Sequence, residues 1–554
     1  MRSVVVGSSL LAAFIFPMPV FADNPVVQTC YTADPAPLVH NGRVYIFVGH
    51  DSTGARDGYL MPDWKCYSSS DMVNWTDHGV VLSPRAFSWA TTKDANASQV
   101  AYRNGKFYFF ASTTASDGVA IGLAVSNSPI GPYKDTLGKP LVSGSQMTGC
   151  NATHSWRGLD PTVFIDDDGQ AYLYWGNNVC YWVRLNDDMI SLKGSISCIP
   201  QNDPAFGPDY EEGPWFYKRN SLYYLLYPSK IPESIHYSTS TGPTGPWKYG
   251  GEIMPVQQGA GSSSTIHPGV IDFGGKSYFF YHDGSLPGGG SYKRSVRIEE
   301  FSYNADGTIP KIPATKDGVK TGVTSLNPFD TTEAETICWE SGIRTAPCGE
   351  GGIMVDSISN GDYLKVEGVD FADGAKTFEA RVASGGSGGT IELRLDSQTG
   401  TLVGTCDVKG TGGWDKWETV SCDVTDASGK KDLFLKFTGG NGRLFNFNWW
   451  RFTPVATDAA VSIPTKAEGR ETIKVRMAAG RPSLLRLDFP QPVSQVNVGL
   501  FDLTGRLIST LFTGKVSSPH RMFQLDLSEV RHGLYVINVS LDGNAALTET
   551  ITVR

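Results

Sequence analysis

One short pattern recurs five times in the first 310 residues and constrains the fold more than any other feature of the sequence. Each copy is a turn dipeptide, one or two spacer residues and an aromatic-rich run. The copies are NGRVYIFVGH from Asn41, NGKFYFFAST from Asn104, DGQAYLYWGN from Asp168, RNSLYYLLYPS from Arg219 and GGKSYFFYHDG from Gly274. Asn-Gly and Asp-Gly favour tight hairpin turns because both tolerate positive φ, and the runs that follow have the composition of buried strands.

The spacing of these copies predicts a β-propeller. They lie some 50 to 65 residues apart, and Ser-rich segments such as CYSSSDMVNWTDHG from Cys66 fall between some of them. A hairpin, a loop and a second hairpin in about 50 residues make one four-stranded blade. The sequence therefore predicts an all-β chain whose residues 23–314 form a five-bladed propeller. A β-sandwich with coincidental turns is the alternative, and the even spacing argues against it.

Ionisable residues precede four of the five copies by seven or eight positions, each followed by Pro or Gly-Pro. They are Asp34, Asp160, Glu212 and His267. The innermost strands of a propeller face its axis, so we expect these side chains to converge. Carboxyl groups held close together raise one another's pKa, which keeps one protonated while another is ionised. Glycosidic bond hydrolysis needs that pair of states.

The segments ADP, LDP, EEGP and IHPG, in this order over residues 28–315, resemble glycoside hydrolase family 43. The resemblance implies a five-bladed propeller, inverting hydrolysis, and arabinofuranosidase or xylosidase activity. It assigns Asp34 as the general base that activates water and Glu212 as the general acid, with Glu211 as a rival for the acid. It assigns Asp160 to tuning the pKa of the acid and orienting it.

The same resemblance suggests residues that contact the substrate or a cation. Arg294 would neutralise the catalytic cluster, with Arg297 as a weaker candidate, and His267 would lie near a bound cation or be an ordinary core histidine. Pocket aromatics, each of which could equally pack in the core, would be Trp89, Trp156 and Trp215. Many family members read Trp-Ala-Pro-Asp where this chain has WATTKDANASQV from Trp89, which leaves the choice between arabinose and xylose open.

A second domain follows a polar linker and occupies residues 328–454. Alternating strands such as TIELRL predict a β-sandwich. The segments TTEAET, SNGDYL, GGWDKWETV and FNFNWW resemble carbohydrate-binding module family 6. The resemblance implies a structural calcium at Glu333 and Glu335, with Asn448 as a further ligand. It also implies sugar binding by Trp414 and Asn441, although Ser357 stands where a facing aromatic is expected and Trp414 could instead pack in the core.

The two ends of the chain suggest export. Residues 1–22 carry Arg2 and an apolar run before Ala22, which predicts a secretory signal peptide rather than a membrane anchor. Residues 463–554, with FDLTGRLI and HGLYVINV, are similar to C-terminal sorting domains of type IX-like secretion and predict a small immunoglobulin-like β-domain, the alternative being an inert spacer. We therefore expect a secreted or cell-surface protein.

Charge and cysteine content narrow the functional classes. A net charge of −9 without a basic stripe argues against nucleic acid and favours a neutral substrate. No later segment is apolar enough to span a membrane, no organic cofactor is implied, and a monomer is expected. Of nine Cys, Cys338/Cys348 and Cys406/Cys422 are plausible local pairs.

The leading hypothesis is therefore a secreted hydrolase that removes α-L-arabinofuranosyl side groups from arabinoxylan in plant cell walls. The alternatives are a β-xylosidase that acts on xylo-oligosaccharides and, in a different class, a non-catalytic carbohydrate-binding propeller.

Overall fold

The computed structural model describes an all-β chain. It covers residues 24–53, 58–92, 94–152, 154–259 and 261–455, Val530, and the segments 474–478, 481–489, 493–501, 507–516, 521–527, 533–541 and 544–553. The predicted signal peptide, 1–22, lies outside the described residues. Within them, helical structure is limited to three short 3₁₀ turns, and no helix is long and apolar enough to cross a membrane.

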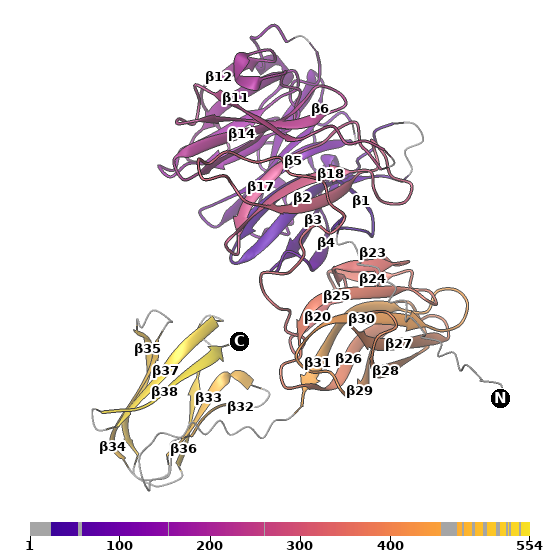
Figure 1. Cartoon of the computed structure of the whole chain (residues 1–554), viewed down its shortest axis with the longest axis vertical. Helices are drawn as coiled ribbons and strands as arrows, with labels where there is room; N and C mark the ends of the chain where they lie inside the picture. Colours follow the sequence, from indigo (N-terminus) through magenta and orange to yellow (C-terminus); the bar gives the residue numbers. More distant parts are fainter. Residues whose placement is uncertain are drawn as a thin grey trace, which may run out of the picture. The chain divides into compact units, whose positions relative to one another are not determined.

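The strands between Tyr31 and Phe301 form a succession of antiparallel sheets, drawn in indigo to pink in Figure 1. The first sheet holds β1 (Tyr31–His40), β2 (Arg43–Asp51), β3 (Trp64–Ser69) and β4 (Trp75–Leu82), and the second holds β5 (Ala95–Arg103), β6 (Lys106–Ala115), β7 (Gly118–Ser126) and β8 (Lys134–Asp135). The third holds β9 (Thr162–Ile165), β10 (Ala171–Trp175), β11 (Val179–Leu185) and β12 (Leu192–Pro200). The fourth holds β13 (Trp215–Arg219), β14 (Leu222–Ser229), β15 (Ser234–Ser240) and β16 (Lys248–Met254), and the last holds β17 (Gly269–Phe273), β18 (Lys276–Asp283) and β19 (Ser295–Phe301).

Each predicted hairpin lies between the first and second strand of one of these sheets. Asn41-Gly42 joins β1 to β2, and Asn104-Gly105 joins β5 to β6. The same position is taken by the turns before β10, β14 and β18. Asn41, Asn104 and Asn220 adopt positive φ of 48°, 51° and 55°, as such turns require. The five hairpins predicted from the repeat are therefore confirmed.

Hydrogen bonds link each sheet to the next. Val163 N donates to Gln99 Oε1 at 2.6 Å between the second and third sheets, and Phe216 N donates to Thr162 Oγ1 at 3.1 Å between the third and fourth. Val296 N donates to Thr32 Oγ1 at 3.2 Å, which connects the last sheet back to the first. None of the described sheets closes on itself. The last sheet instead contacts the first, through hydrogen bonds between the two.

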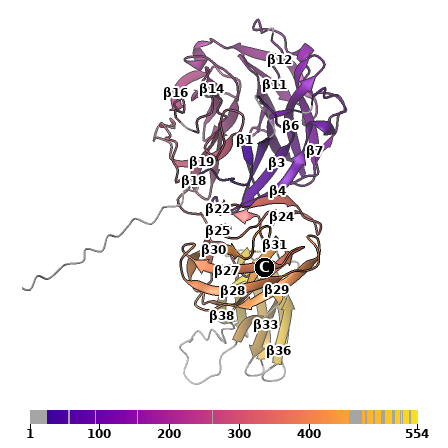
Figure 2. The same cartoon turned by 90° about the vertical axis from the view of Figure 1, so that its right-hand side faces the viewer.

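Residues 332–454 form the predicted β-sandwich, in salmon and orange in Figure 2. One sheet contains β20 (Thr332–Glu333), β23 (Arg344–Pro347), β24 (Ile353–Asp356), β26 (Ala375–Ala383), β29 (Trp417–Asp423) and β31 (Asn446–Pro454). The other contains β22 (Trp339–Ser341), β25 (Tyr363–Asp370), β27 (Gly388–Leu395), β28 (Leu402–Lys409) and β30 (Lys430–Thr438). Fully buried side chains from both sheets, among them Phe378, Trp450, Leu393 and Leu435, share one core.

The sandwich is joined to the first sheet by backbone pairing, which the sequence did not predict. Strand β21 (Thr336–Ile337) adds to the edge of β4 as a fifth strand, with Thr336 opposite Thr76 and Ile337 opposite Trp75. Asn74 and the backbone of Glu367 exchange two hydrogen bonds of 2.8 Å. The first sheet and the sandwich are therefore held together by ladder and side-chain hydrogen bonds in addition to the chain that links them.

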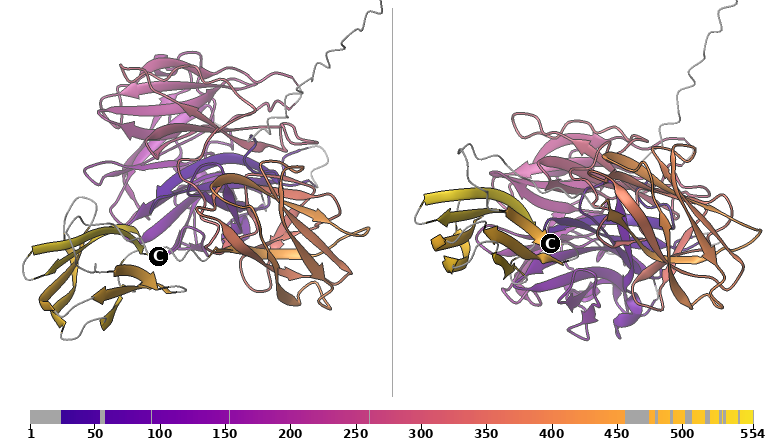
Figure 3. Two further views of the ribbon diagram at one scale, coloured as in Figure 1. Left: turned by 60° about the horizontal axis from the view of Figure 1, so that its bottom comes forward. Right: turned by 90° about the horizontal axis from the view of Figure 1, so that it is seen from below.

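The C-terminal part forms a separate compact unit (Figure 3). One sheet contains β32 (Lys474–Ala478), β33 (Arg481–Phe489) and β36 (Arg521–Asp526), and the other contains β34 (Val493–Phe501), β35 (Leu507–Val516), β37 (Gly533–Leu541) and β38 (Asn544–Val553). Leu487, Val496, Val498 and Ile537 are buried in its core. The β character expected for residues 463–554 is confirmed where the structure describes them.

The cysteines pair differently from the expectation. The structure contains a disulfide between Cys150 and Cys198. Cys348 is a free thiol and so is not bonded to Cys338. Cys406 and Cys422 lie within hydrogen-bonding reach of each other across the sandwich, but as thiols. Sequence proximity thus predicted correctly that Cys406 and Cys422 are neighbours, but not that they are thiols. It did not predict the disulfide between Cys150 and Cys198, which are 48 residues apart.

Candidate active site

Two aspartates, each followed by a proline, supply carboxyl groups at the first strands of two different sheets. Asp34 lies at a break in the register between β1 and β2, and Asp160 comes directly before β9. Both adopt a left-handed backbone, with φ of 52° and 63°. Residues other than glycine are held in this region only where the surroundings fix them, and such positions cluster at functional sites. The shared Asp-Pro pattern therefore corresponds to a shared backbone conformation.

Arg294, close before β19, connects the last sheet to the first through two carboxylates. Its Nη1 donates to Asp34 Oδ1 at 3.0 Å, and its Nε and Nη2 donate to the two oxygens of Asp51 at 2.8 and 2.9 Å. Arg294 and both aspartates are buried. A buried guanidinium that is hydrogen-bonded to two carboxylates supplies the positive charge that ionised aspartates need away from water.

Glu212 is half-buried, and its carboxyl forms an electrostatic cluster with Asp34, Asp160 and Arg294. Burial, with the charges of Asp34 and Glu211, raises the pKa of Glu212 to about 7 against the lowering effects of a hydrogen bond from Asn177 and of the charge of Arg294. That bond runs from Asn177 Nδ2 to Glu212 Oε2 at 2.8 Å. The Glu212 carboxyl is thus poised to hold a proton near neutral pH while remaining able to release it.

Asp160 lies behind Glu212 and contacts the backbone that carries it. Gly213 N donates to Asp160 Oδ2 at 3.0 Å, and Asp160 N donates to Ser112 Oγ at 3.0 Å. Burial raises the pKa of Asp160 well above its ordinary value, and the charges of Glu212 and Asp34 raise it further. Because neighbouring buried carboxyls cannot all ionise, the cluster retains a proton near neutral pH.

Glu211 occupies a different environment from its neighbour. Its carboxyl accepts a hydrogen bond from Asn178 Nδ2 at 3.3 Å, and its backbone pairs with Asn178 and Pro228. Burial raises the pKa of Glu211, the hydrogen bond from Asn178 lowers it, and the charge of Asp209, instead of those of Asp34 and Asp160, raises it. Of the two adjacent glutamates, Glu212 is the one whose charge is coupled to Asp34.

Two histidines flank Asp34. His267 Nδ1 lies 3.9 Å from Asp34 Oδ1. His282 Nδ1 accepts a hydrogen bond from Asp34 N at 3.1 Å, and its Nε2 lies 3.0 Å from Thr265 O. Burial lowers the pKa of both histidines. Among the residues that the structure describes, no group of three or more His, Cys, Asp or Glu side chains is placed to hold a metal ion, so the expected cation near His267 has no such ligand set here.

The three candidate pocket tryptophans lie in different environments. Trp156 is 53% exposed, four residues before Asp160. Trp215 is buried and its Nε1 donates to Val270 O at 3.2 Å, so it packs between the fourth and last sheets instead of facing a ligand. Trp89 packs beside Phe87, with ring centroids 5.2 Å apart, and its ring contacts the backbone at Gly122. Only Trp156 is freely available to a substrate among these three.

Several residues of the site were missed by sequence reasoning. Asp51 and His282 lie at or near the ends of second strands, and Asn177 follows another. Tyr59 has the guanidinium of Arg294 over its ring at 5.8 Å and meets the exposed ring of Tyr292 at 5.9 Å. A polar residue that ends an apolar strand was the available signal, visible in VGHD, YWGN and YHDG.

Another buried carboxyl, Glu233, lies close to the cluster and was also missed. Its Oε2 accepts from Ile266 N at 2.6 Å, next to His267, and its pKa is raised well above the ordinary value by burial and then by Glu212. This contact fixes the segment that carries His267. The Arg297 alternative, in contrast, binds Asp283 and the carbonyl of Thr315, away from Asp34.

The sandwich residues predicted to bind sugar are exposed. Trp414 is 36% exposed, and the guanidinium of Arg443 lies over its ring at 4.3 Å. Asn441 and Ser357 are exposed as well. The face of the Trp414 ring that Arg443 covers is not free for stacking on a sugar.

The residues predicted to bind calcium lie on neighbouring backbone segments, but among the described residues they do not form a group of three or more His, Cys, Asp or Glu side chains placed to hold a metal ion. Glu333 is opposite Trp449 in the β20–β31 pair, and Ala334 N donates to Asn448 O at 2.9 Å. Glu335 is buried, and burial followed by the charges of Glu333 and Asp77 raises its pKa to about 9. Its Oε2 is buried and makes no hydrogen bond with the residues that the structure describes.

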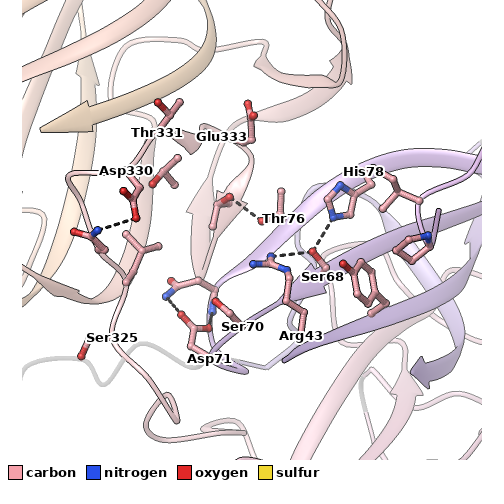
Figure 4. A pocket seen from close by; sticks show the side chains of 18 of the residues that line it. Arg43, Ser68, Ser70, Asp71, Thr76, His78, Ser325, Asp330, Thr331 and Glu333 are labelled. Atoms are coloured by element: carbon pink, nitrogen blue, oxygen red, sulfur yellow. Dashed lines mark hydrogen bonds between the residues drawn. The ribbon is translucent and has the colours of Figure 1, made fainter. Parts of the chain in front are cut away.

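A polar cavity of about 600 Å³ lies between the first sheet and the sandwich, at the end of β2 that carries Arg43 (Figure 4). Arg43 Nη2 donates to Ser68 Oγ at 3.0 Å, and Ser68 Oγ lies 2.7 Å from His78 Nε2. Burial lowers the pKa of His78 to about 4, so this imidazole is neutral at pH 7. Asp330 and Glu333 contribute the opposite wall.

The catalytic cluster thus combines buried carboxyls in different states with a charged arginine, as hydrolysis of a glycosidic bond requires. Comparison with known proteins agrees. The family model "Glycosyl hydrolases family 43" matches residues 22–309, and "Carbohydrate binding module (family 6)" matches residues 333–454.

Characterised relatives match most of the chain. An arabinoxylan arabinofuranohydrolase from Bacillus subtilis is 37% identical over 487 residues, which are 78% of this chain and 92% of that protein. One from Paenibacillus polymyxa is 35% identical over 485 residues, 78% of this chain and 74% of that protein. A crystal structure of a family 43 arabinoxylan arabinofuranohydrolase from Bacillus subtilis, in complex with cellotetraose, superimposes with a TM-score of 0.68 at 34% identity, covering 79% of this chain and 98% of that chain. The chain is therefore a glycoside hydrolase that belongs to glycosyl hydrolases family 43 and carries a family 6 carbohydrate-binding module.

Proposed function

We propose that this enzyme removes α-L-arabinofuranosyl side groups from arabinoxylan with inversion at the anomeric carbon. The observation that carries the proposal is the coupling of Asp34, held by Arg294, to Glu212, whose pKa is raised to about 7. One carboxyl is paired with a cation and the other retains a proton, which are the states that a general base and a general acid require. The arabinoxylan-active relatives support the choice of substrate.

In the proposed reaction, the Asp34 carboxylate accepts a proton from a water molecule as the water oxygen attacks the anomeric carbon. The bond between that carbon and the glycosidic oxygen breaks, and Glu212 donates its proton to the leaving oxygen. The side group departs as free arabinose and the main chain keeps a hydroxyl. Asp160 orients the acid through the Gly213 N–H and favours its protonated state. An inverting enzyme of this kind holds the two carboxyls about 6.5–9.5 Å apart to admit the water.

The fold that we infer for residues 23–314 is a five-bladed propeller, in which each of the successive sheets is one blade. The hydrogen bonds from sheet to sheet, and from the last to the first through Thr32 and Arg294, support this arrangement. It would bring Asp34, Asp160 and Glu212 to one axis from the first, third and fourth blades.

A calcium ion in the binding module fits the residues present. Buried Glu335 has an oxygen without a hydrogen-bond partner among the described residues, and the charges that act on it are those of Glu333 and Asp77, both acidic. Oxygen ligands of this type suit Ca²⁺, which would neutralise them. Glu333 and Glu335 would hold the ion, with the side chain or backbone of Asn448 as a further ligand.

Export is proposed from the sequence. Residues 1–22 would direct secretion, and residues 463–554 would form an immunoglobulin-like domain for type IX-like sorting to the outside or to the cell surface. Mass spectrometry of the extracellular protein would test both, because a mature chain that begins at Asp23 supports the signal peptide and one that still begins at Met1 contradicts it.

Product analysis tests the enzymatic proposal most simply. Incubation with arabinoxylan should release arabinose and leave xylo-oligosaccharides uncut, and proton nuclear magnetic resonance during the first minutes should detect the inverted anomer. Release of xylose from xylo-oligosaccharides would favour a β-xylosidase instead. Absence of any released sugar would favour a carbohydrate-binding propeller.

A further inference from the structure

A second cavity at the junction between the first sheet and the sandwich, of about 830 Å³, lies at the opposite end of β2 from the pocket of Figure 4. Arg43, in the Figure 4 pocket, begins β2, whereas Asp51, in this cavity, ends it. One wall comes from the first sheet and the loop after β18, and the other comes from residues 339–345 and Tyr363 of the sandwich. We call this cavity the junction groove.

The two walls of the junction groove are fixed relative to each other. Strand β21 pairs with β4, and the hydroxyls of Thr76 and Thr336 lie 2.8 Å apart. Thr345, which lines the groove, donates its hydroxyl to Asp77 Oδ2 at 2.8 Å. Because backbone and side-chain hydrogen bonds join β4 to the sandwich, the groove between them is a preformed site.

The groove lies beside the catalytic cluster. Tyr31, which lies three residues before Asp34, pairs with Asp51 at the end of the β1–β2 ladder. Tyr31 and Asp51 both line the groove. Asp51 also binds Arg294, which binds Asp34. The loop after β18 contributes Pro287, whose carbonyl accepts the Tyr31 hydroxyl at 2.6 Å.

The other end of the loop after β18 lies near the active site. Tyr292 meets the ring of Tyr59, over which Arg294 lies. One loop therefore borders both the junction groove and the surroundings of the catalytic arginine.

The chemistry of the lining fits a neutral carbohydrate. Half-buried Tyr31 and Trp339 and buried Tyr363 offer aromatic surface, which binds the apolar faces of sugar rings. The charged groups are mostly compensated within the protein, because Lys65 pairs with Asp77, His50 with Asp63, and Asp51 with Arg294. Exposed Arg344 and Ser341 remain as hydrogen-bonding groups at the rim. By contrast, Tyr45 is the one Phe, Trp or Tyr among the described residues that line the Figure 4 pocket.

We propose that the junction groove binds the β-1,4-xylan main chain next to the xylose whose side group is removed, so that the binding module forms part of the substrate site of the catalytic domain. The inference rests on the proposed arabinofuranohydrolase function and adds the site that holds the polymer. A small aryl arabinofuranoside has no main chain and does not reach the groove.

The test compares polymer with small substrate in the full chain. Trp339→Ala removes aromatic surface, and Ser341→Trp adds bulk at the rim without removing a contact. We expect each to lower the ratio of kcat/KM on arabinoxylan to kcat/KM on an aryl α-L-arabinofuranoside by about fivefold to tenfold, through KM for the polymer. Tyr45→Ala, in the Figure 4 pocket, is the matched aromatic control and should leave this ratio within twofold. Thermal unfolding confirms that each variant is folded.

A direct binding measurement separates this inference from the proposed function. Calorimetry with unbranched xylohexaose and the Glu212→Gln protein should give a Kd that weakens about tenfold when Trp339→Ala is added. An unchanged ratio and an unchanged Kd in the folded groove variants would overturn the inference even if the enzyme hydrolyses arabinofuranosides. Loss of hydrolysis on the aryl substrate in the unmodified chain would instead refute the proposed function, and the xylohexaose measurement would still decide whether the groove binds xylan.

Discussion

Acidic side chains in the two domains of residues 24–455 have charged neighbours of different sign. In the catalytic domain, Arg294 pairs with Asp34 and Asp51 while the pKa of Glu212 rises to about 7. In the binding module, burial and the acidic neighbours Glu333 and Asp77 raise the pKa of Glu335 to about 9. A cluster that contains its own cation can keep one carboxyl charged and another neutral, and so is suited to proton transfer. A cluster of acids alone is suited to an external cation.

The largest expected effect is the loss of either catalytic carboxyl. Asp34→Asn and Glu212→Gln should each lower kcat on arabinoxylan by about 10³-fold, because general acid and base catalysis contribute on that scale. Glu211→Gln is the matched control, since its carboxyl is coupled to Asn178 rather than to Asp34, and should keep activity within about tenfold. The reverse order for the two glutamates, measured on folded proteins, would assign the acid to Glu211.

A smaller effect is expected at Asp160, which does not exchange protons with the substrate. Asp160→Asn should lower kcat by about 10²-fold because the Gly213 N–H loses its carboxylate partner. It should also move the alkaline limb of the pH profile, because the titrations of Asp160 and Glu212 are coupled through their charges. A loss of activity with an unmoved alkaline limb would indicate a purely structural role for Asp160.

Calcium tests the other half of the comparison. Adding Ca²⁺ to chelator-treated protein should raise Tm by a few degrees, because an ion that binds only the folded state stabilises it. Glu335→Gln should abolish this response while leaving kcat on an aryl arabinofuranoside unchanged. If the Tm of the unmodified protein is the same with Ca²⁺ and with chelator, the binding module has no calcium site.

The smallest expected effect concerns stability and pH. A carboxyl whose pKa is raised on folding favours the folded state only while it is protonated, so the contribution of Glu212 is lost as pH rises through about 7. Glu212→Gln cannot ionise and should therefore have a Tm a few degrees above that of the unmodified protein at pH 8, with a smaller difference at pH 5. Equal Tm differences at both pH values would argue that the Glu212 carboxyl is not buried in an unfavourable environment.

Much of the fold could be predicted because the determining signals are local. Turn dipeptides such as Asn41-Gly42 require positive φ, and the aromatic runs after them pair as hairpins in all five places. Asp34 and Asp160 were found because the Asp-Pro step recurs at one position of the repeat. Asp51, His282 and Tyr59 were missed because their roles come from contacts with Arg294 and Asp34, which lie up to 248 residues away.

The junction between the domains shows the same limit. Nothing in the segment TIC indicates that Thr336 and Ile337 pair with β4. The edge of β4 is available only after the first sheet has folded, so the pairing depends on tertiary structure. Trp215 illustrates the same limit, since the sequence left open whether it faces a pocket or packs in the core, and that depends on where Val270 lies.

The central claim is that Asp34 and Glu212 act on the same bond in opposite protonation states. Aryl arabinofuranosides with a good leaving group need no protonation of the leaving oxygen, whereas those with a poor one do. Glu212→Gln should therefore retain most of its kcat/KM on a dinitrophenyl substrate, with no alkaline limb near pH 7, and lose it on a poor leaving group, while Asp34→Asn loses both. Equal losses of Glu212→Gln on the two substrates, with the alkaline limb still present, would contradict the account.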